Sequence, residues 1–181
     1  MNKLVKDDEI IAICNAHYAI NKFTTNHGAL IFAENLAGDV SNSVIYRKEE
    51  GNSGHHIDVY LDIKRGFIKS IWFVSIQSEV LYFDEQLSFD FDKICRIPFF
   101  DISMWGNENV EIWSLIRNDN FLEIYHNGED LLYLSFGESK ILEPLNNNVL
   151  LQYDDDYALT GIVIKDGKEI PKLLDALFSK R

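Results

Sequence analysis

The chain has 181 residues, of which 46% are hydrophobic and 13% aromatic, and 29 acidic against 17 basic side chains give it a net charge of −12. This length and apolar content predict a single domain over residues 1–181 with a sizeable core, and they exclude a disordered chain, which would lack the apolar side chains needed to offset the entropy of ordering. The acidic balance, with no cluster of lysine and arginine, disfavours direct binding to nucleic acid or to an anionic membrane.

The N-terminal region predicts a helix followed by a loop. Asp7-Asp8 precede the apolar positions, where the positive end of a helix favours acids. Residues 47–54 are charged and then glycine-bearing, so we expect an exposed loop there. Spacings of three and four define the helical face, which consists of Ile10, Ile13, Cys14 and His17.

From residue 56 the apolar period changes to two, which is typical of strands. Residues 56–63 alternate most clearly, and 67–76 and 80–83 follow as further strands after a turn at 64–66. In residues 87–92, Leu, Phe and Phe alternate with Ser, Asp and Asp, which predicts another strand.

The second half predicts an antiparallel meander and a closing helix. Strand-like segments at 110–117, 121–126 and 131–136 are joined by short polar turns, of which Asn127-Gly128 is the strongest hairpin signal. No helix of crossover length separates these segments, so a parallel βαβ sheet is not expected.

Strands at 149–153 and 160–165 follow the meander. Residues 170–178 then repeat apolar side chains with the spacing of an amphipathic helix, and Pro171 is tolerated in the first turn of that helix. The fold class predicted is therefore α+β, a predominantly antiparallel sheet with an N-terminal and a C-terminal helix.

The cysteines and the apolar runs bear on location. Cys14 and Cys95 are isolated, which predicts neither a disulfide framework nor a zinc site. Residues 1–9 carry no apolar stretch typical of a secretory signal, and runs such as 71–74 are far shorter than the roughly 20 residues that span a bilayer. We expect a cytoplasmic protein without a metal or other cofactor.

Few patterns point to catalysis. His56 and Asp58 would share one face of a strand as an acid–base or metal pair, and Asp90 and Asp92 could form a carboxylate pair of the kind that glycoside hydrolases use. Residues 154–156 lack the ligand spacing of a calcium loop. No phosphate-binding loop, zinc-protease helix or nucleophile elbow is present. A small hydrolase or metal-dependent enzyme therefore stays an alternative, as does a structural or adaptor module.

Aromatic and acidic side chains are interleaved at residues 82–85, 89–92 and 153–157. Interface hot spots favour aromatic residues, and complementary charge speeds association by 10 to 10³-fold. Such a surface suits a basic protein partner, because its carboxylates can imitate the phosphates that a nuclease binds. The candidate partner-binding residues are Asp84, Glu85, Asp90, Asp92, Tyr153, Asp154, Asp155, Asp156 and Tyr157.

With acid-rich strands at 80–92, a meander at 110–136 and short Asn/Asp turns, the chain resembles bacterial immunity proteins that neutralise secreted toxins, including those of contact-dependent growth inhibition. The resemblance is one of general character over the whole chain, and no motif assigns roles to residues. It implies a cognate toxin, often a nuclease, that is bound in the cytoplasm. The leading hypothesis is a non-enzymatic toxin antagonist, and a phage-encoded inhibitor of a nucleic-acid-guided nuclease would show the same features.

Overall fold

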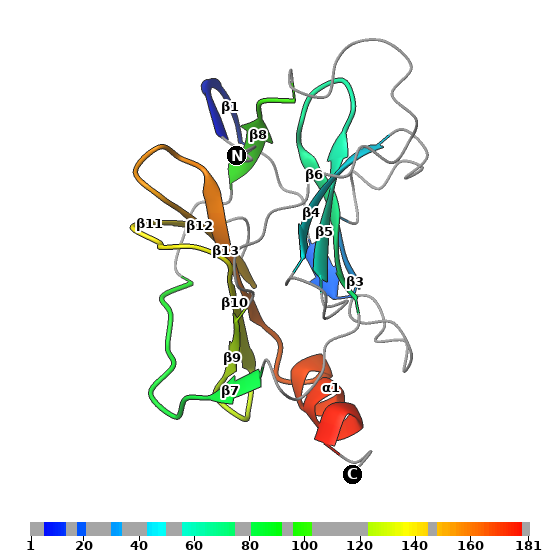
Figure 1. Cartoon of the computed structure of the whole chain (residues 1–181), viewed down its shortest axis with the longest axis vertical. Coiled ribbons are helices and arrows are strands. Elements are labelled where there is room, and N and C mark those ends of the chain that lie inside the picture. Colours follow the sequence, from blue (N-terminus) through cyan, green and yellow to red (C-terminus); the bar gives the residue numbers. More distant parts are fainter. Residues whose placement is uncertain are drawn as a thin grey trace.

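A computed structural model of the chain describes residues 6–13, 18–20, 30–33, 43–49, 56–74, 81–91, 96–102, 123–144 and 148–178. Within these ranges the protein is mostly β, with strands in a six-stranded sheet, a five-stranded sheet and a two-stranded ladder, and one short helix (Figure 1). The elements are β1 Lys6–Ile13, β2 Tyr18–Ile20, β3 Leu30–Ala33, β4 Ser43–Glu49, β5 His56–Asp62, β6 Ile68–Val74, β7 Leu81–Phe83, β8 Arg96–Phe100, β9 Glu123–His126, β10 Leu131–Ser135, β11 Ile141–Pro144, β12 Val149–Tyr153, β13 Leu159–Lys165 and α1 Glu169–Phe178.

The six-stranded sheet has the order β11-β12-β13-β10-β9-β7. Its pairs are antiparallel except for β7, which runs parallel to β9 at the edge. The predicted hairpin around Asn127-Gly128 is confirmed, because β9 and β10 pair across it and Gly128 has φ of 83°. The first strand of the predicted meander, at 110–117, lies outside the described residues.

The two large sheets share one hydrophobic core. In β12 and β13 the branched and aliphatic side chains that the sequence pattern assigned to strands are buried, and they pack with residues of β4, β5 and β6. The sheets face each other in Figure 1, with α1 at one end between them. The five-stranded sheet contributes Tyr46, Val59, Leu61 and Ile68, the six-stranded sheet contributes residues such as Ile124, Leu134, Leu151, Tyr153 and Ile162, and the helix contributes Ile170, Leu173 and Leu174.

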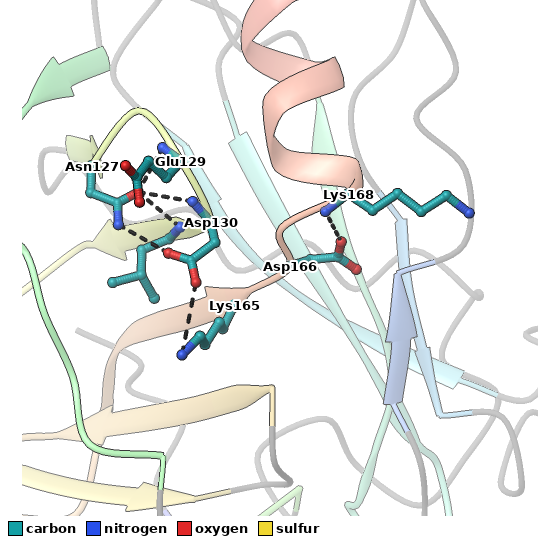
Figure 2. A network of polar contacts seen from close by, with 7 residues as sticks. Asn127, Glu129, Asp130, Lys165, Asp166 and Lys168 are labelled. Carbon is teal, nitrogen blue, oxygen red and sulfur yellow. Dashed lines mark hydrogen bonds and ion pairs between the residues drawn. The ribbon is translucent and has the colours of Figure 1, made fainter.

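A polar corner fixes the end of the six-stranded sheet and the start of α1 (Figure 2). Asn127 Oδ1 accepts hydrogen bonds from three consecutive backbone N–H groups, those of residues 129–131, and its Nδ2 donates to Asp130. Asp166 caps the helix by accepting from the backbone N–H groups of Lys168 and Glu169, each at 2.8 Å. The predicted C-terminal helix is thus confirmed, with Pro171 in its first turn.

The predicted N-terminal helix is wrong, and with it the α+β class. Lys6–Ile13 forms strand β1, which pairs antiparallel with β8 from Lys6↔Phe100 to Ile13↔Arg96. The isoleucines at positions 10, 11 and 13 are β-branched and favour strands, so pairing with β8 overrides the spacing that also fits a helix. Cys14 and His17 lie outside the described residues.

Two loop and strand predictions also need correction. Arg47, expected in an exposed loop, lies in β4 together with residues 48 and 49. Residues 87–91, expected as a strand, have no ladder partner among the described residues, although their side chains alternate between half-buried and exposed as predicted. No helix in the described part of the chain is long and apolar enough to cross a membrane.

Candidate functional site

The face of the six-stranded sheet that points away from the main core carries a second, smaller apolar cluster. Leu131, Leu150 and Val163 are buried there. The segment 84–91 runs over this face, and its alternate side chains Leu87, Phe89 and Phe91 pack on the cluster. The alternation of apolar side chains in this segment therefore arises because the segment packs on the face of the sheet, although it is not itself a strand of that sheet.

Three tyrosines lie side by side on this outer face. Tyr82 is in register with Tyr125, and Tyr125 is in register with Tyr133, so β7, β9 and β10 each contribute one ring. The Tyr82 and Tyr125 ring centroids are 5.4 Å apart with planes inclined by 33°, and those of Tyr125 and Tyr133 are 5.7 Å apart at 22°. Phe89 packs edge-on against Tyr133 at 5.4 Å. We call Tyr82, Tyr125 and Tyr133 the tyrosine row.

One carboxylate contacts the row directly, and others lie in the segment that follows Tyr82. Glu123 accepts a hydrogen bond from the Tyr125 hydroxyl at 2.8 Å, and this bond, with burial and the charge of Glu123, raises the pKa of Tyr125 to about 12. Glu85 and Asp90 are exposed in the segment that follows Tyr82. We refer to the tyrosine row together with Asp84, Glu85, Asp90 and Glu123 as the acidic tyrosine face.

Asp84 stabilises the turn that follows β7. Its backbone N–H donates to His126 O at 2.9 Å, and its Oδ1 accepts from the backbone N–H of Gln86 at 2.9 Å. These bonds attach the 84–91 segment to the end of β9 and form the turn that presents Glu85 to solvent.

The other predicted acidic group, residues 154–156, is built as a turn between β12 and β13. Asp154 Oδ1 accepts from the backbone N–H groups of Asp156 and Ala158, and Tyr157 holds a positive φ of 57°. Asp155 makes an ion pair with Lys140. Asp154 thus shapes the turn, while Asp155 and Asp156 are exposed.

The structure does not bring all the predicted partner-binding residues together. The 154–156 turn precedes β13, whereas the far end of β13 lies beside the start of β10, near the β9–β10 turn and Asp84, so the two acidic groups lie at opposite ends of a seven-residue strand. Tyr153 is 0% exposed and packs against Phe100, so its side chain does not reach a surface. Asp92 lies outside the described residues.

Of the alternative catalytic pair, the structure describes the side chain of Asp58. Asp58 is buried on β5 and accepts two hydrogen bonds from Arg47 on β4, from Nε at 2.5 Å and from Nη2 at 2.6 Å. The guanidinium of Arg47 thus engages both oxygens of this carboxylate. The side chain of His56 is outside the description. No group of three or more His, Cys, Asp or Glu among the described residues could hold a metal ion.

Other polar side chains of β5 and β6 lie near this pair along the sheet. Tyr60 lies two positions along the strand, and burial, followed by the charge of Asp58, raises its pKa while Arg47 opposes that rise. Lys69 is buried and its Nζ lies 3.7 Å from Asp62 Oδ2. The Arg47–Asp58 and Lys69–Asp62 ion pairs each join two neighbouring strands and so stabilise the sheet.

The candidate residues named from the sequence lack four members of the acidic tyrosine face, Glu123 and the three tyrosines of the row, although Tyr82 lies in the interleaved segment 82–85. Tyr125 and Tyr133 lie in segments predicted as strands, but only the strand register places Tyr125 beside Tyr82 and Tyr133 beside Tyr125. No protein-family model matches the chain, and no curated protein matches it either.

Proposed function

We propose that this protein is a non-enzymatic inhibitor of the immunity type, which binds a basic protein partner through the acidic tyrosine face. The observation that carries the proposal is the coincidence of an exposed ring with carboxylates at the sheet edge: Tyr82 is 45% exposed, and Asp84 and Glu85 follow in the next turn. Exposed aromatic groups supply binding energy, and carboxylates supply steering and specificity.

A basic toxin, such as a nuclease acting in the cytoplasm, is the partner that this chemistry favours. A nuclease holds its substrate with cationic side chains, and a face with carboxylates at Glu85, Asp90 and Glu123 would compete with phosphates for them. Inhibition would follow from covering the toxin's substrate site or a neighbouring surface.

The proposed function is tested by capture from the native host with wild-type bait and with the double variant Glu85→Lys/Asp90→Lys. Wild-type bait is expected to capture a basic protein that is toxic when expressed alone and harmless when co-expressed with this chain. The double variant should reduce the association rate by at least about tenfold at low salt, because exposed charges act mainly on the encounter.

The matched control is Glu138→Lys/Asp175→Lys, which makes the same change in charge at exposed positions outside the face. A second comparison, Asp155→Lys/Asp156→Lys, tests the other acidic group. Equal capture and protection by the wild type and by Glu85→Lys/Asp90→Lys at low salt would rule out this surface as the binding site.

A further inference from the structure

The tyrosine row ends in an exposed ring. Tyr82 packs against Tyr125 on one side, and β7 is the last strand of the six-stranded sheet among the described residues. The ring is 45% exposed, so a planar group from another molecule can lie against its outer side and continue the row. In Figure 1, β7 leads directly into the segment 84–91.

The carboxylates near the Tyr82 ring favour a cationic group as its stacking partner. Asp84 and Glu85 come two and three positions after Tyr82, and Glu123 lies at the hydroxyl of the neighbouring Tyr125. A described cation on the same face, Lys165, lies instead over Phe91, with Nζ 5.6 Å from the ring centroid. The end of the row therefore presents a π-face and carboxylates to whatever approaches it.

We propose that Tyr82 is the stacking position for an arginine side chain of the basic partner, an inference that rests on the proposed function. The guanidinium is planar, weakly hydrated and always charged, so it can stack on the ring and pair with a carboxylate at once. Lysine carries the same charge, but its compact, strongly hydrated ammonium cannot stack in this way.

Two other occupants fit less well. A second copy of this chain would bring another net charge of −12 and the same carboxylates to the contact. A nucleobase can stack on tyrosine, but the phosphates attached to it would approach Asp84 and Glu85 at an energetic cost.

The test compares two blocked peptides of equal charge, hexa-arginine and hexa-lysine, binding to the full chain at low salt in a calorimeter. Hexa-arginine is expected to bind about two- to fivefold more tightly through the stacked contact. Tyr82→Leu should remove that preference and leave hexa-lysine binding within about twofold, whereas Tyr82→Phe should keep the preference because the ring remains.

The control variant is Tyr157→Leu, at the turn that carries the other acidic group. It should keep the preference, and a loss equal to that of Tyr82→Leu would overturn the inference. A measurement on the wild type avoids any dependence on folding of a variant: in NMR spectra with labelled tyrosine, hexa-arginine should shift the Tyr82 ring signals more than hexa-lysine does.

The outcomes separate the inference from the proposed function. Equal binding of both peptides, weakened alike by Glu85→Lys/Asp90→Lys, would support the acidic face and overturn the arginine position. Binding of neither peptide above a neutral peptide of the same length would count against both. Tighter binding of a short oligothymidylate than of hexa-arginine would also overturn the arginine position.

Discussion

At the scale of single residues, Gly66 joins parts of the fold that are distant in sequence. It ends the turn after β5 with φ of 73°, and its backbone oxygen accepts a hydrogen bond from Phe100 N at 2.9 Å. A Cβ added at this position would lie 2.1 Å from Phe100 O, a backbone atom that cannot move without disturbing the end of β8. The sequence predicts the turn from its composition, but only the structure reveals this close approach.

Gly66→Ala is expected to lower the free energy of unfolding by about 2–4 kcal/mol, from backbone strain at positive φ and from the collision with Phe100. Urea unfolding followed by circular dichroism measures the change. Gly167→Ala is the matched control, because a Cβ there meets Asp130 at an ordinary 3.7 Å and should change stability by less than about 0.5 kcal/mol. Similar losses for both variants would show that the approach to Phe100 is unimportant.

At the scale of elements, alternation predicts strands well where local and tertiary preferences agree. The segments at β5, β6, β10, β12 and β13 are found where the period of two or the β-branched composition placed them. Residues 6–13 are missed because the same isoleucines satisfy a helical spacing and a strand propensity, and pairing with the distant β8 decides between them. Such a pairing is not encoded in any local pattern.

The candidate site depends on register, which is less predictable than strand content. A two-residue turn at Asn127-Gly128 would place Tyr125 opposite Asp130. Asn127 instead accepts hydrogen bonds from the N–H groups of residues 129–131, which makes a wider loop and sets Tyr125 opposite Tyr133. The exposed acids Glu85 and Asp90 could be named from the sequence, but the tyrosine row could not.

The Arg47–Asp58 pair connects β4 to β5 at one register position. Asp58→Asn is expected to cost about 2–4 kcal/mol of unfolding free energy, because Arg47 loses its buried counter-charge. The double variant Arg47→Met/Asp58→Leu should recover most of that loss, since an apolar pair leaves no charge uncompensated. Denaturant unfolding of all variants checks this.

The same variants test the enzymatic alternative. If Asp58 only links strands, Arg47→Met/Asp58→Leu should leave capture of the basic partner unchanged. A hydrolytic activity of the wild type that disappears in this double variant would contradict the structural role.

The β7–β9 edge contains a buried titratable group. His126 on β9 is 6% exposed with its ring centroid 5.6 Å from that of Phe83, and burial lowers its pKa below the ordinary 6.5. Because the unfolded chain then binds the proton more readily, the contribution of a neutral His126 is fully present above about pH 6.5 and is lost as the pH falls towards its folded pKa.

Stability measured between pH 7.5 and 5 should therefore fall less steeply in His126→Phe than in the wild type. The comparison is the difference between the two unfolding curves at each pH, so that all other titrating groups cancel. Identical pH dependence in both proteins would mean that His126 is protonated equally well in the folded and unfolded chain.

At the scale of the whole molecule, one core connects elements from both halves of the chain. Ile68 on β6 and Ile162 on β13 are fully buried members of the same apolar cluster, although one belongs to the five-stranded and the other to the six-stranded sheet. Packing across the sheets makes each one support the other, which is the physical basis for expecting a single domain over residues 1–181.

Ile68→Val and Ile162→Val each remove one buried methylene and should each cost about 0.5–1.5 kcal/mol. If the sheets unfold together, both variants shift the same transition, and near-ultraviolet circular dichroism, which reports side-chain packing, coincides with the far-ultraviolet signal of the backbone. Two separate transitions, with Ile68→Val moving only one of them, would instead divide the chain into independently folding halves. In that case the acidic tyrosine face would belong to the unit formed by the six-stranded sheet, because β7, β9 and β10, which carry the tyrosine row, are all strands of that sheet.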